Sequence, residues 1–280
     1  MESATAPRLR EQPRVATDYA KLGTIRELWD YRELFYFLAW RDIKLRYKQT
    51  ALGVLWVVIQ PLLTMVVFTL LFGQLVKIPT DGIPRPIFYF SALLPWTYFS
   101  STLTNAGLSL VTNSNLLTKI YFPRIILPAA PVLSGLLDFL IGSALLAGFL
   151  AYYRIPLGWN LLLWPLLIVP LALLALGVGC FLAALNVRYR DVRYAIPFAI
   201  QLWLFATPII YPSSFIPERF QWLLALNPLS WIIEASRYAL VPSQAIHWDA
   251  LGLSLAVNLA IFFAGVAYFR RAERDFADIV

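Results

Sequence analysis

The chain has 280 residues, of which 60% are hydrophobic and 14% charged, and its mean hydropathy is +0.67. This composition excludes an ordinary soluble domain, in which charged residues make up about a quarter of the chain. Several uncharged runs reach the roughly 20 residues that a membrane-spanning helix needs, and they lack the alternation of barrel strands. The sequence therefore predicts an all-α polytopic membrane protein.

The N-terminal residues 1–30 are polar and basic, and we expect them to be cytoplasmic and partly disordered. They contain no apolar segment typical of a signal peptide, so the first spanning helix is expected to direct insertion.

An amphipathic interface helix is predicted over residues 31–50. Its aromatic and aliphatic side chains fall on one face, and its basic side chains fall on another. The first face holds Tyr36, Trp40, Ile43 and Tyr47, and the second holds Arg41, Lys44 and Lys48. A solvated helical linker is the alternative.

Six spanning helices are predicted in a transmembrane domain over residues 51–270, followed by a cytoplasmic tail, 271–280. The spans are expected near 54–76, 87–112, 124–153, 161–186, 194–211 and 250–269. Most of the 23 lysines and arginines fall at the N-terminus, in alternate loops and in the tail. The positive-inside rule therefore places both termini and the loop 113–123 in the cytoplasm.

The connection before the last span is unusual. Residues 213–240 contain two apolar helical patterns that are broken at Asn227-Pro228, and each is too short to cross a membrane. This favours a re-entrant helical hairpin, within which Glu234 and Arg237 lie one turn apart and are expected to pair. The alternative is an extracellular loop with helices on the membrane surface.

Catalytic and metal-binding motifs are absent from the sequence. It contains no P-loop, G-x-S-x-G or H-E-x-x-H motif, and its one histidine, His247, is expected to be solvated. We predict no catalytic residue, no metal and no cofactor bound by this chain. Asp138 is the one clear ionisable residue within a span, and it is predicted to be a neutral or hydrogen-bonded packing residue, which disfavours an ion-coupled carrier.

Several sequence motifs, in this order, resemble the membrane subunit of ABC-2 type polysaccharide exporters, the O-antigen and teichoic acid permeases. They are "WRDIKLRYKQTALGVLWVVIQPL" (40–62), "SALLPWTYFSSTL" (91–103), "NSNLLTKIYFPRIILP" (113–128), "NVRYRDVRYAIPFAIQLWLFATPIIYP" (186–212) and "NPLSWIIEASRYAL" (227–240). The resemblance covers about residues 30–275. It implies a homodimer in the bacterial inner membrane, paired with two copies of an ATPase subunit that binds ATP and Mg²⁺. The substrate would be an undecaprenyl-diphosphate-linked glycan, and nucleic acid is not an expected partner.

In such a transporter, the loop 113–123 would be a coupling helix that contacts the ATPase. Asn113 or Ser114 would cap it. The expected ATPase-coupling residues are Asn113, Ser114, Leu116, Leu117, Lys119, Ile120 and Arg124, with Arg188 and Arg190 in a second contact. The alternative is an ordinary cytoplasmic turn.

Two further sets of residues follow from the resemblance. The interface helix would hold the lipid diphosphate through Trp40, Arg41, Lys44, Arg46, Tyr47 and Lys48. Aromatic side chains would line a glycan channel, namely Trp56, Tyr89, Trp96, Tyr98, Phe99, Trp203, Phe205 and Tyr211. The alternative for the aromatics is the belt found at any membrane interface.

Other functions stay open. An ABC-2 permease for teichoic acid, capsule, or a non-glycan lipid or drug is the nearest alternative. A membrane enzyme acting on lipid-linked sugars would need paired carboxylates or a histidine near a membrane face, whereas Asp191, Glu218 and Asp249 are isolated in the sequence.

Overall fold

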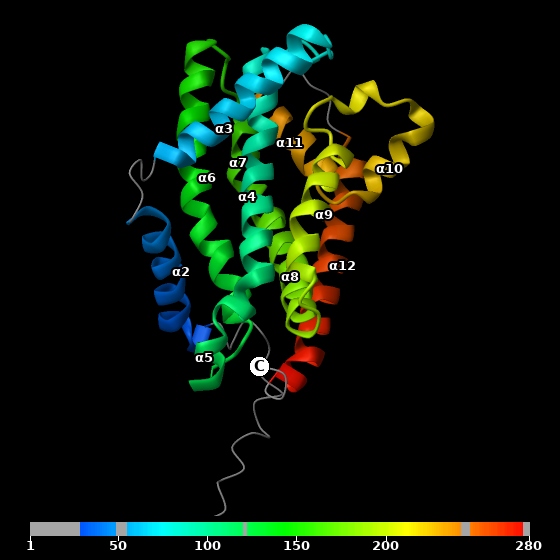
Figure 1. Cartoon of the computed structure of the whole chain (residues 1–280). Coiled ribbons are helices and arrows are strands. Elements are labelled where there is room, and N and C mark those ends of the chain that lie inside the picture. The colour runs from blue at the N-terminus through cyan, green and yellow to red at the C-terminus, as the bar shows by residue number, and fades with distance from the viewer. Residues whose placement is uncertain (1–28, 49–54, 120–121, 242–246, 277–280) are drawn as a thin grey trace, which may run out of the picture.

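The computed structural model describes residues 29–48, 55–119, 122–241 and 247–276, and every regular element within these ranges is helical. The elements in chain order are α2 (Arg32–Tyr47), α3 (Leu55–Phe68), η3 (Thr69–Leu75), α4 (Arg85–Thr112), α5 (Ser114–Lys119), α6 (Ile126–Tyr152), η4 (Trp159–Leu162), α7 (Leu163–Leu166), α8 (Ile168–Arg188), α9 (Val192–Ala206), η5 (Ser213–Phe215), η6 (Glu218–Phe220), α10 (Gln221–Leu226), α11 (Ser230–Leu240), α12 (Trp248–Ala272) and η7 (Glu273–Asp275). Figure 1 shows the long helices packed side by side, with α6 on one flank of the bundle and α12 on the other.

Four helical segments are long and apolar enough to cross a membrane. They are Leu55–Leu75, Ile126–Tyr152, Trp159–Arg188 and Trp248–Ala272. The other two predicted spans do not meet this test. The helix α4 has 28 residues but carries many hydroxyl side chains, and α9 has only 15 residues. The all-helical membrane fold is confirmed, whereas the count of six spans stays a prediction.

The fifth predicted span, 194–211, is longer than the helix that forms. α9 ends at Ala206 because Asn227 holds the chain there: its Nδ2 donates to the Ala206 carbonyl (3.1 Å) and to Thr207 Oγ1 (3.0 Å). Pro208 follows at once and has no N–H with which to continue the helix. The turn after α9 is therefore fixed by contacts with the hairpin.

The central helix of the bundle is α4. It contacts α3, α6, α8, α9 and α11, and most of its residues are buried. These contacts on several sides bury its apolar side chains and also several of its serine and threonine hydroxyls. The bundle is therefore organised around α4.

The backbones of α8 and α12 cross in direct contact. A Cβ atom added to Gly265 would lie 2.0 Å from the Gly177 carbonyl oxygen, and one added to Gly177 would lie 2.5 Å from the Phe262 Cα. Small residues at such crossings let two helices approach closely and gain van der Waals contact.

Both helices of the predicted hairpin are present, and the break lies at Asn227-Pro228 as expected. α11 is almost wholly buried and contacts α4, α7 and α12, whereas α10 is largely exposed. Figure 1 shows α11 behind α4 and α10 projecting from the bundle. Insertion of this hairpin into a membrane stays a prediction.

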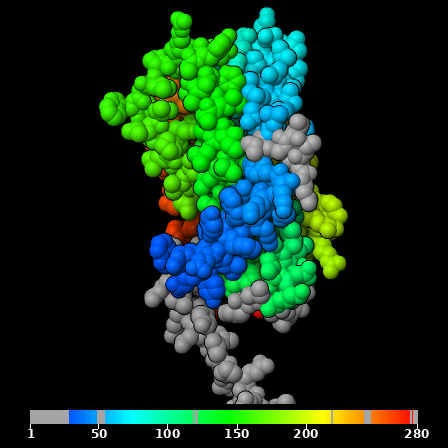
Figure 2. All heavy atoms as spheres, turned by 90° about the vertical axis from the view of Figure 1, so that its left-hand side faces the viewer, coloured from blue at the N-terminus to red at the C-terminus, as the bar shows by residue number. Residues whose placement is uncertain are grey.

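One end of the bundle, here called the basic end, carries α5, the turn between α8 and α9, and the end of α12 (Figure 1). Its cationic side chains are Lys119, Arg124, Arg188, Arg190, Arg193, Arg270, Arg271 and Arg274. α2 packs on α6, with Leu38 and Ala39 buried, and runs obliquely across the lower half of the face in Figure 2.

Candidate functional site

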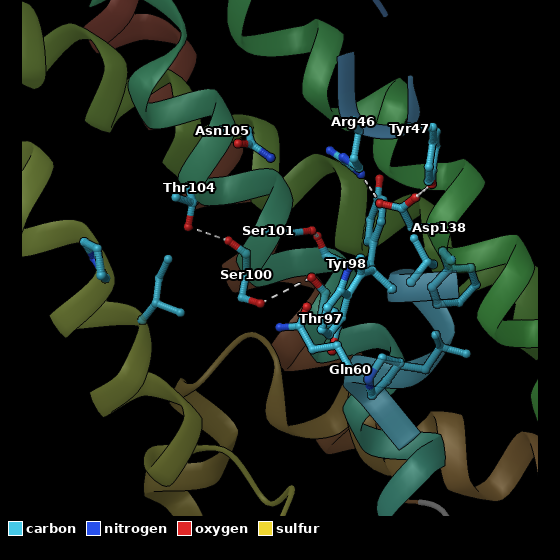
Figure 3. A pocket seen from close by; sticks show the side chains of 17 residues that line it. Arg46, Tyr47, Gln60, Thr97, Tyr98, Ser100, Ser101, Thr104, Asn105 and Asp138 are labelled. Carbon is cyan, nitrogen blue, oxygen red and sulfur yellow. Dashed lines mark hydrogen bonds and ion pairs between the residues drawn. The ribbon is translucent and has the colours of Figure 1, made fainter. Parts of the chain in front are cut away.

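A cleft of about 540 Å³ opens beside α4, midway along the bundle. Five helices line it: the end of α2, the start of α3, the middle of α4, and parts of α6 and α9. Figure 3 shows its polar side chains pointing toward one another from these helices. A cavity of this size and mixed lining is typical of a ligand-binding site.

Hydroxyl and amide groups dominate the α4 wall of the cleft. The hydroxyls are partnered on their own helix: Thr104 Oγ1 donates to the Ser100 carbonyl (2.8 Å), and Ser101 Oγ donates to the Tyr98 carbonyl (3.3 Å). Their oxygens still have acceptor capacity toward the cleft. The amides of Gln60 and Asn105 are exposed and make no hydrogen bond within the described part of the chain. This wall therefore offers several donors and acceptors to a ligand.

One ion pair lies in the cleft. Arg46 Nη1 and Tyr47 Oη, at the end of α2, both donate to the carboxylate of Asp138 on α6. Burial raises the pKa of the Tyr47 hydroxyl, so it stays protonated and acts as a donor. Asp138 is hydrogen-bonded, as predicted, and its partners are the Arg46 guanidinium and the Tyr47 hydroxyl.

The predicted channel aromatics do not form one group. Trp56 and Tyr98 line the cleft, and Tyr98 Oη donates to the Val132 carbonyl (3.1 Å). Phe205 is exposed on α9.

The remaining channel aromatics are buried or half-buried in packing contacts. These are Tyr89, Trp96, Phe99, Trp203 and Tyr211. The rings of Phe99 and Trp203 are 5.1 Å apart, and Trp203 Nε1 donates to Asn227 Oδ1 (2.9 Å). Within one protomer, Tyr89, Trp96 and Phe99 are therefore core residues, and their role in lining a channel stays a prediction.

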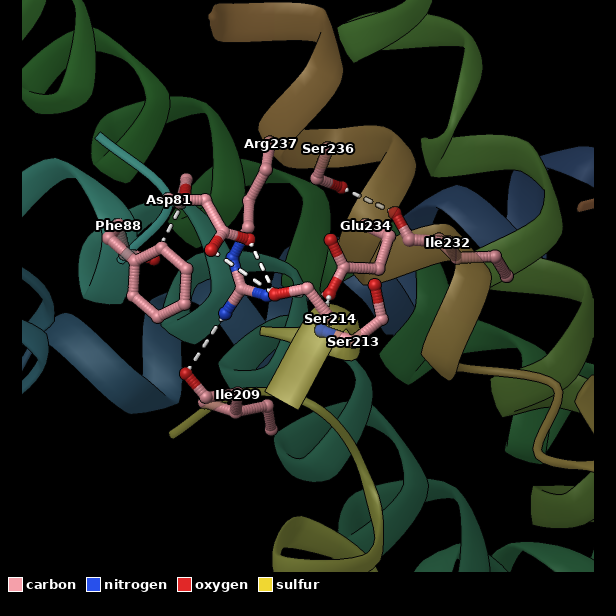
Figure 4. A network of polar contacts seen from close by, with 10 residues as sticks. Asp81, Phe88, Ile209, Ser213, Ser214, Ile232, Glu234, Ser236 and Arg237 are labelled. Carbon is pink, nitrogen blue, oxygen red and sulfur yellow. Dashed lines mark hydrogen bonds and ion pairs between the residues drawn. The ribbon is translucent and has the colours of Figure 1, made fainter. Parts of the chain in front are cut away.

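The predicted pair of Glu234 and Arg237 is present. Arg237 Nη1 lies 2.9 Å from Glu234 Oε1, and the guanidinium is buried. Its Nη2 donates to the Ile209 carbonyl (3.0 Å), and its Cζ lies 3.8 Å from the centre of the Phe88 ring. Glu234 Oε1 also accepts the Ser213 N–H (2.9 Å). Figure 4 shows Arg237 at the centre of this network.

The network extends to the loop after η3. Ser214 Oγ donates to the Asp81 carboxylate, at 2.9 Å from Oδ2. Three segments thus meet in this network: the loop after η3, the segment after α9 that includes η5, and α11 (Figure 4).

A short helix forms at the predicted coupling loop. α5 covers Ser114–Lys119, with Lys119 exposed and Leu116 and Leu117 half-buried against an apolar cluster of this chain. Asn113 or Ser114 was expected to cap this helix, but the Asn113 side chain does not do so through its oxygen. Its Nδ2 donates back to the Ser109 carbonyl (2.8 Å), and its own carbonyl accepts the Leu116 N–H (2.9 Å).

Three other predicted coupling residues lie at the basic end, and Ile120 lies outside the described residues. Arg188 and Arg190 are exposed. Arg124 is bonded within the chain: its N–H donates to Glu273 Oε1 (3.2 Å), and its Nη1 donates to the Glu273 carbonyl (2.7 Å). Its Cζ also lies 5.8 Å from the centre of the Phe276 ring.

Comparisons with known proteins identify the family. The model of the ABC-2 type transporter family matches residues 33–241. The chain belongs to the ABC-2 type transporters. It is an integral membrane protein, and the match extends from α2 to the end of α11, so it includes every residue that lines the cleft.

Three relatives are similar over most of the chain. An O-antigen export system permease protein, RfbA, of Myxococcus xanthus is 31% identical over 260 residues, which are 91% of this chain and 98% of the relative. RfbA of Klebsiella pneumoniae is 28% identical, covering 86% and 92%. The polysialic acid transport protein KpsM of Escherichia coli is 26% identical, covering 83% and 91%.

The helix α2 of this ABC-2 transporter, the predicted interface helix, presents two kinds of side chain. The rings of Tyr36 and Trp40 stack at 6.3 Å, and Lys44 Nζ lies 5.8 Å from the centre of the Trp40 ring. Lys48 is also exposed. The other basic residues are paired, Arg41 with Asp42 (2.9 Å) and Arg46 with Asp138.

Two residues important to this ABC-2 transporter were missed by sequence reasoning. Asn227 joins the end of α9 to the hairpin, and Glu273 joins α12 to Arg124. The Asn-Pro break marked Asn227 as a turn residue, but its bonds to α9 span about twenty positions in sequence. His247 is exposed, as expected.

Proposed function

We propose that this chain is the channel-forming transmembrane subunit of an ATP-driven exporter that moves an undecaprenyl-diphosphate-linked polysaccharide, such as O-antigen, across the bacterial inner membrane. The observation that carries the proposal is the cleft beside α4, whose α4 wall is polar although the cleft lies among apolar helices. Support comes from relatives that are named as O-antigen export permeases. A teichoic acid, capsule, or non-glycan lipid or drug substrate is the alternative.

The chemistry of the cleft suits a glycan. Sugars present many hydroxyl groups, which are both donors and acceptors, and the wall of Ser100, Ser101 and Thr104 with Asn105 offers matching groups. The Trp56 ring supplies a flat surface for the apolar face of a sugar. Such a lining holds many sugars weakly, which permits passage rather than tight binding.

A second copy of the chain is expected to complete the channel. The cleft lies between α3 and α9, and both helices expose large apolar side chains beside it. These are Trp56, Leu63, Phe198, Leu202 and Phe205. Exposed apolar side chains grouped in this way are typical of an interaction surface.

The basic end is proposed to face the cytoplasm and to bind two copies of an ATPase subunit. Its surplus of lysine and arginine agrees with the positive-inside rule, which also places both termini inside. ATP and Mg²⁺ would be held by the ATPase subunit, and this chain would transmit its motion through α5. At the other end, α11 and its Arg237 network would form the gate.

Export itself can be tested on the cleft. In vesicles containing the chain and its ATPase, we expect a Thr104→Val, Asn105→Leu variant to export the lipid-linked glycan up to about tenfold more slowly, because it loses two hydrogen-bonding groups. Thr64→Val is the matched control. Thr64 Oγ1 also donates to a carbonyl four residues back, that of Gln60 (3.0 Å), but Thr64 does not line the cleft. Equal losses in both variants would argue against a role of the cleft in transport.

Coupling to the ATPase can be tested on α5. We expect a Leu116→Asp, Lys119→Glu variant to lose co-purification with the ATPase, because it reverses the charge of the exposed Lys119 and disturbs the packing of Leu116. Lys119→Glu alone isolates the surface charge, since the side chain is exposed. An intact complex with unchanged ATP hydrolysis would refute the coupling role and favour the alternative, an ordinary cytoplasmic turn.

A further inference from the structure

The cleft contains a cation and an anion that neutralise each other. Among the described residues that line it, Arg46 and Asp138 are the charged ones. Asp138 lies in an otherwise apolar stretch of α6, where a carboxylate costs several kcal/mol to place in a membrane. Packing alone gives no reason for a carboxylate at this position, since an apolar residue would fill it at lower cost.

The pair is accessible rather than sealed in the core. The side chains of Arg46 and Asp138 are 30% and 21% exposed. Both face the cleft in Figure 3, where Tyr47 holds the second carboxylate oxygen. A ligand in the cleft can therefore reach the guanidinium without unfolding the helices.

Arg46 also lines a second cavity, of about 290 Å³, between α2, α4 and α6. The two cavities share Arg46 and Asn105 as lining residues. The second cavity extends toward the basic end, as far as Asn113 at the start of the coupling loop. Arg46 thus stands between the basic end and the polar wall of α4.

We propose that the Asp138 carboxylate is bound to Arg46 at the position that a phosphate group can take, and that the diphosphate of a lipid-linked substrate displaces this carboxylate. This inference rests on the proposed function, because it takes the substrate to carry a diphosphate. A guanidinium binds phosphate and carboxylate oxygens through the same forked geometry, so one anion can replace the other. The charge of Arg46 is then paired before and after the exchange, which avoids a desolvated, unpaired cation.

The exchange has a mechanical result. Arg46 and Tyr47 are the residues through which the end of α2 is bonded to α6. When Arg46 binds the diphosphate instead, the Tyr47 hydroxyl is the one donor of this pair that is still hydrogen-bonded to Asp138. Arrival of substrate would in this way loosen the interface helix from α6.

Competition between the two anions gives a distinctive prediction. Asp138→Asn should bind undecaprenyl diphosphate about fivefold more tightly in nanodiscs than the wild type does, since the competing charge is removed. Release should slow at the same time, so ATP turnover stimulated by the lipid should fall. Arg46→Gln should abolish the binding. If the pair of Arg46 and Asp138 has only a structural role, Asp138→Asn should instead weaken binding of the lipid, because Arg46 would be less well positioned.

Glu33→Gln is the control. It also removes one carboxylate, on the same helix α2, but Glu33 is exposed and lines neither cavity. We expect it to leave lipid affinity unchanged. If the wild type binds the lipid and Asp138→Asn binds equally or more weakly, displacement is refuted while the proposed function stands. If the wild type does not bind the lipid, the proposed substrate fails as well.

A second measurement does not depend on the folding of the Asp138 variant. Spin labels at Tyr36→Cys and Leu140→Cys, both exposed positions on α2 and α6, report the distance between these helices. The native Cys180 is buried and is not expected to react. Added undecaprenyl diphosphate should lengthen or broaden the distance distribution, and an unchanged distribution would overturn the proposal.

Discussion

Replacement of Glu234 by alanine is expected to lower the free energy of unfolding by about 3–5 kcal/mol, because the buried guanidinium of Arg237 loses its counter-ion. The Ser213 N–H loses its acceptor in the same variant. The measurement is the thermal stability of the purified protein in detergent, read as the fraction of protein that stays monodisperse after heating.

The double variant Glu234→Ala, Arg237→Met is the control for this effect. It removes both charges and puts a flexible apolar side chain in place of the guanidinium, so no unpaired ion stays buried. We expect it to be more stable than Glu234→Ala alone. If the double variant is less stable than the single one, the contacts of Arg237 with Ile209 and Phe88 matter more than its pairing with Glu234.

Replacement of Gly265 by alanine is expected to destabilise the protein by about 3 kcal/mol, at the upper end of overpacking effects, because the new methyl group meets the backbone of α8. The Gly177 carbonyl oxygen would lie only 2.0 Å from this Cβ, and a backbone atom cannot move aside as the end of a side chain can. The same heating assay in detergent measures the loss.

The matched control lies on the same helix. A Cβ added to Gly252 of α12 meets no atom within 4 Å, so Gly252→Ala should leave stability unchanged or raise it slightly through better helix propensity. If the two variants lose equal stability, the cause would be a general effect of alanine in α12 rather than the crossing with α8.

Helices could be predicted from the sequence because length and apolar composition are local properties. α2, α3 with η3, α4, α6 and α12 form close to the predicted ranges. The fifth span was predicted too long because the predicted range runs through Pro208, whereas α9 ends at Ala206, whose carbonyl accepts from Asn227, about twenty residues further along the chain. Apolar periodicity carries no information about such a contact.

The site was predictable only in part for the same reason. The Glu234–Arg237 pair lies within one helical turn, and spacing was enough to predict it. Asp138 and Arg46 are 92 positions apart, so neither could be assigned its partner from spacing. Aromatic residues were equally hard to place, because Phe99 and Trp56 both lie in predicted spans, yet Phe99 is buried and Trp56 is exposed.

The bond between Arg124 and Glu273 gives the predicted coupling loop, which ends just before Arg124, a second connection to the bundle. Along the chain, the loop leads directly into α6. Through Glu273, it is also bonded to the turn after α12, on the opposite flank of the bundle (Figure 1). The segment that follows α5 is therefore attached to both flanks, so a displacement of α5 would reach α6 along the chain and α12 through Glu273.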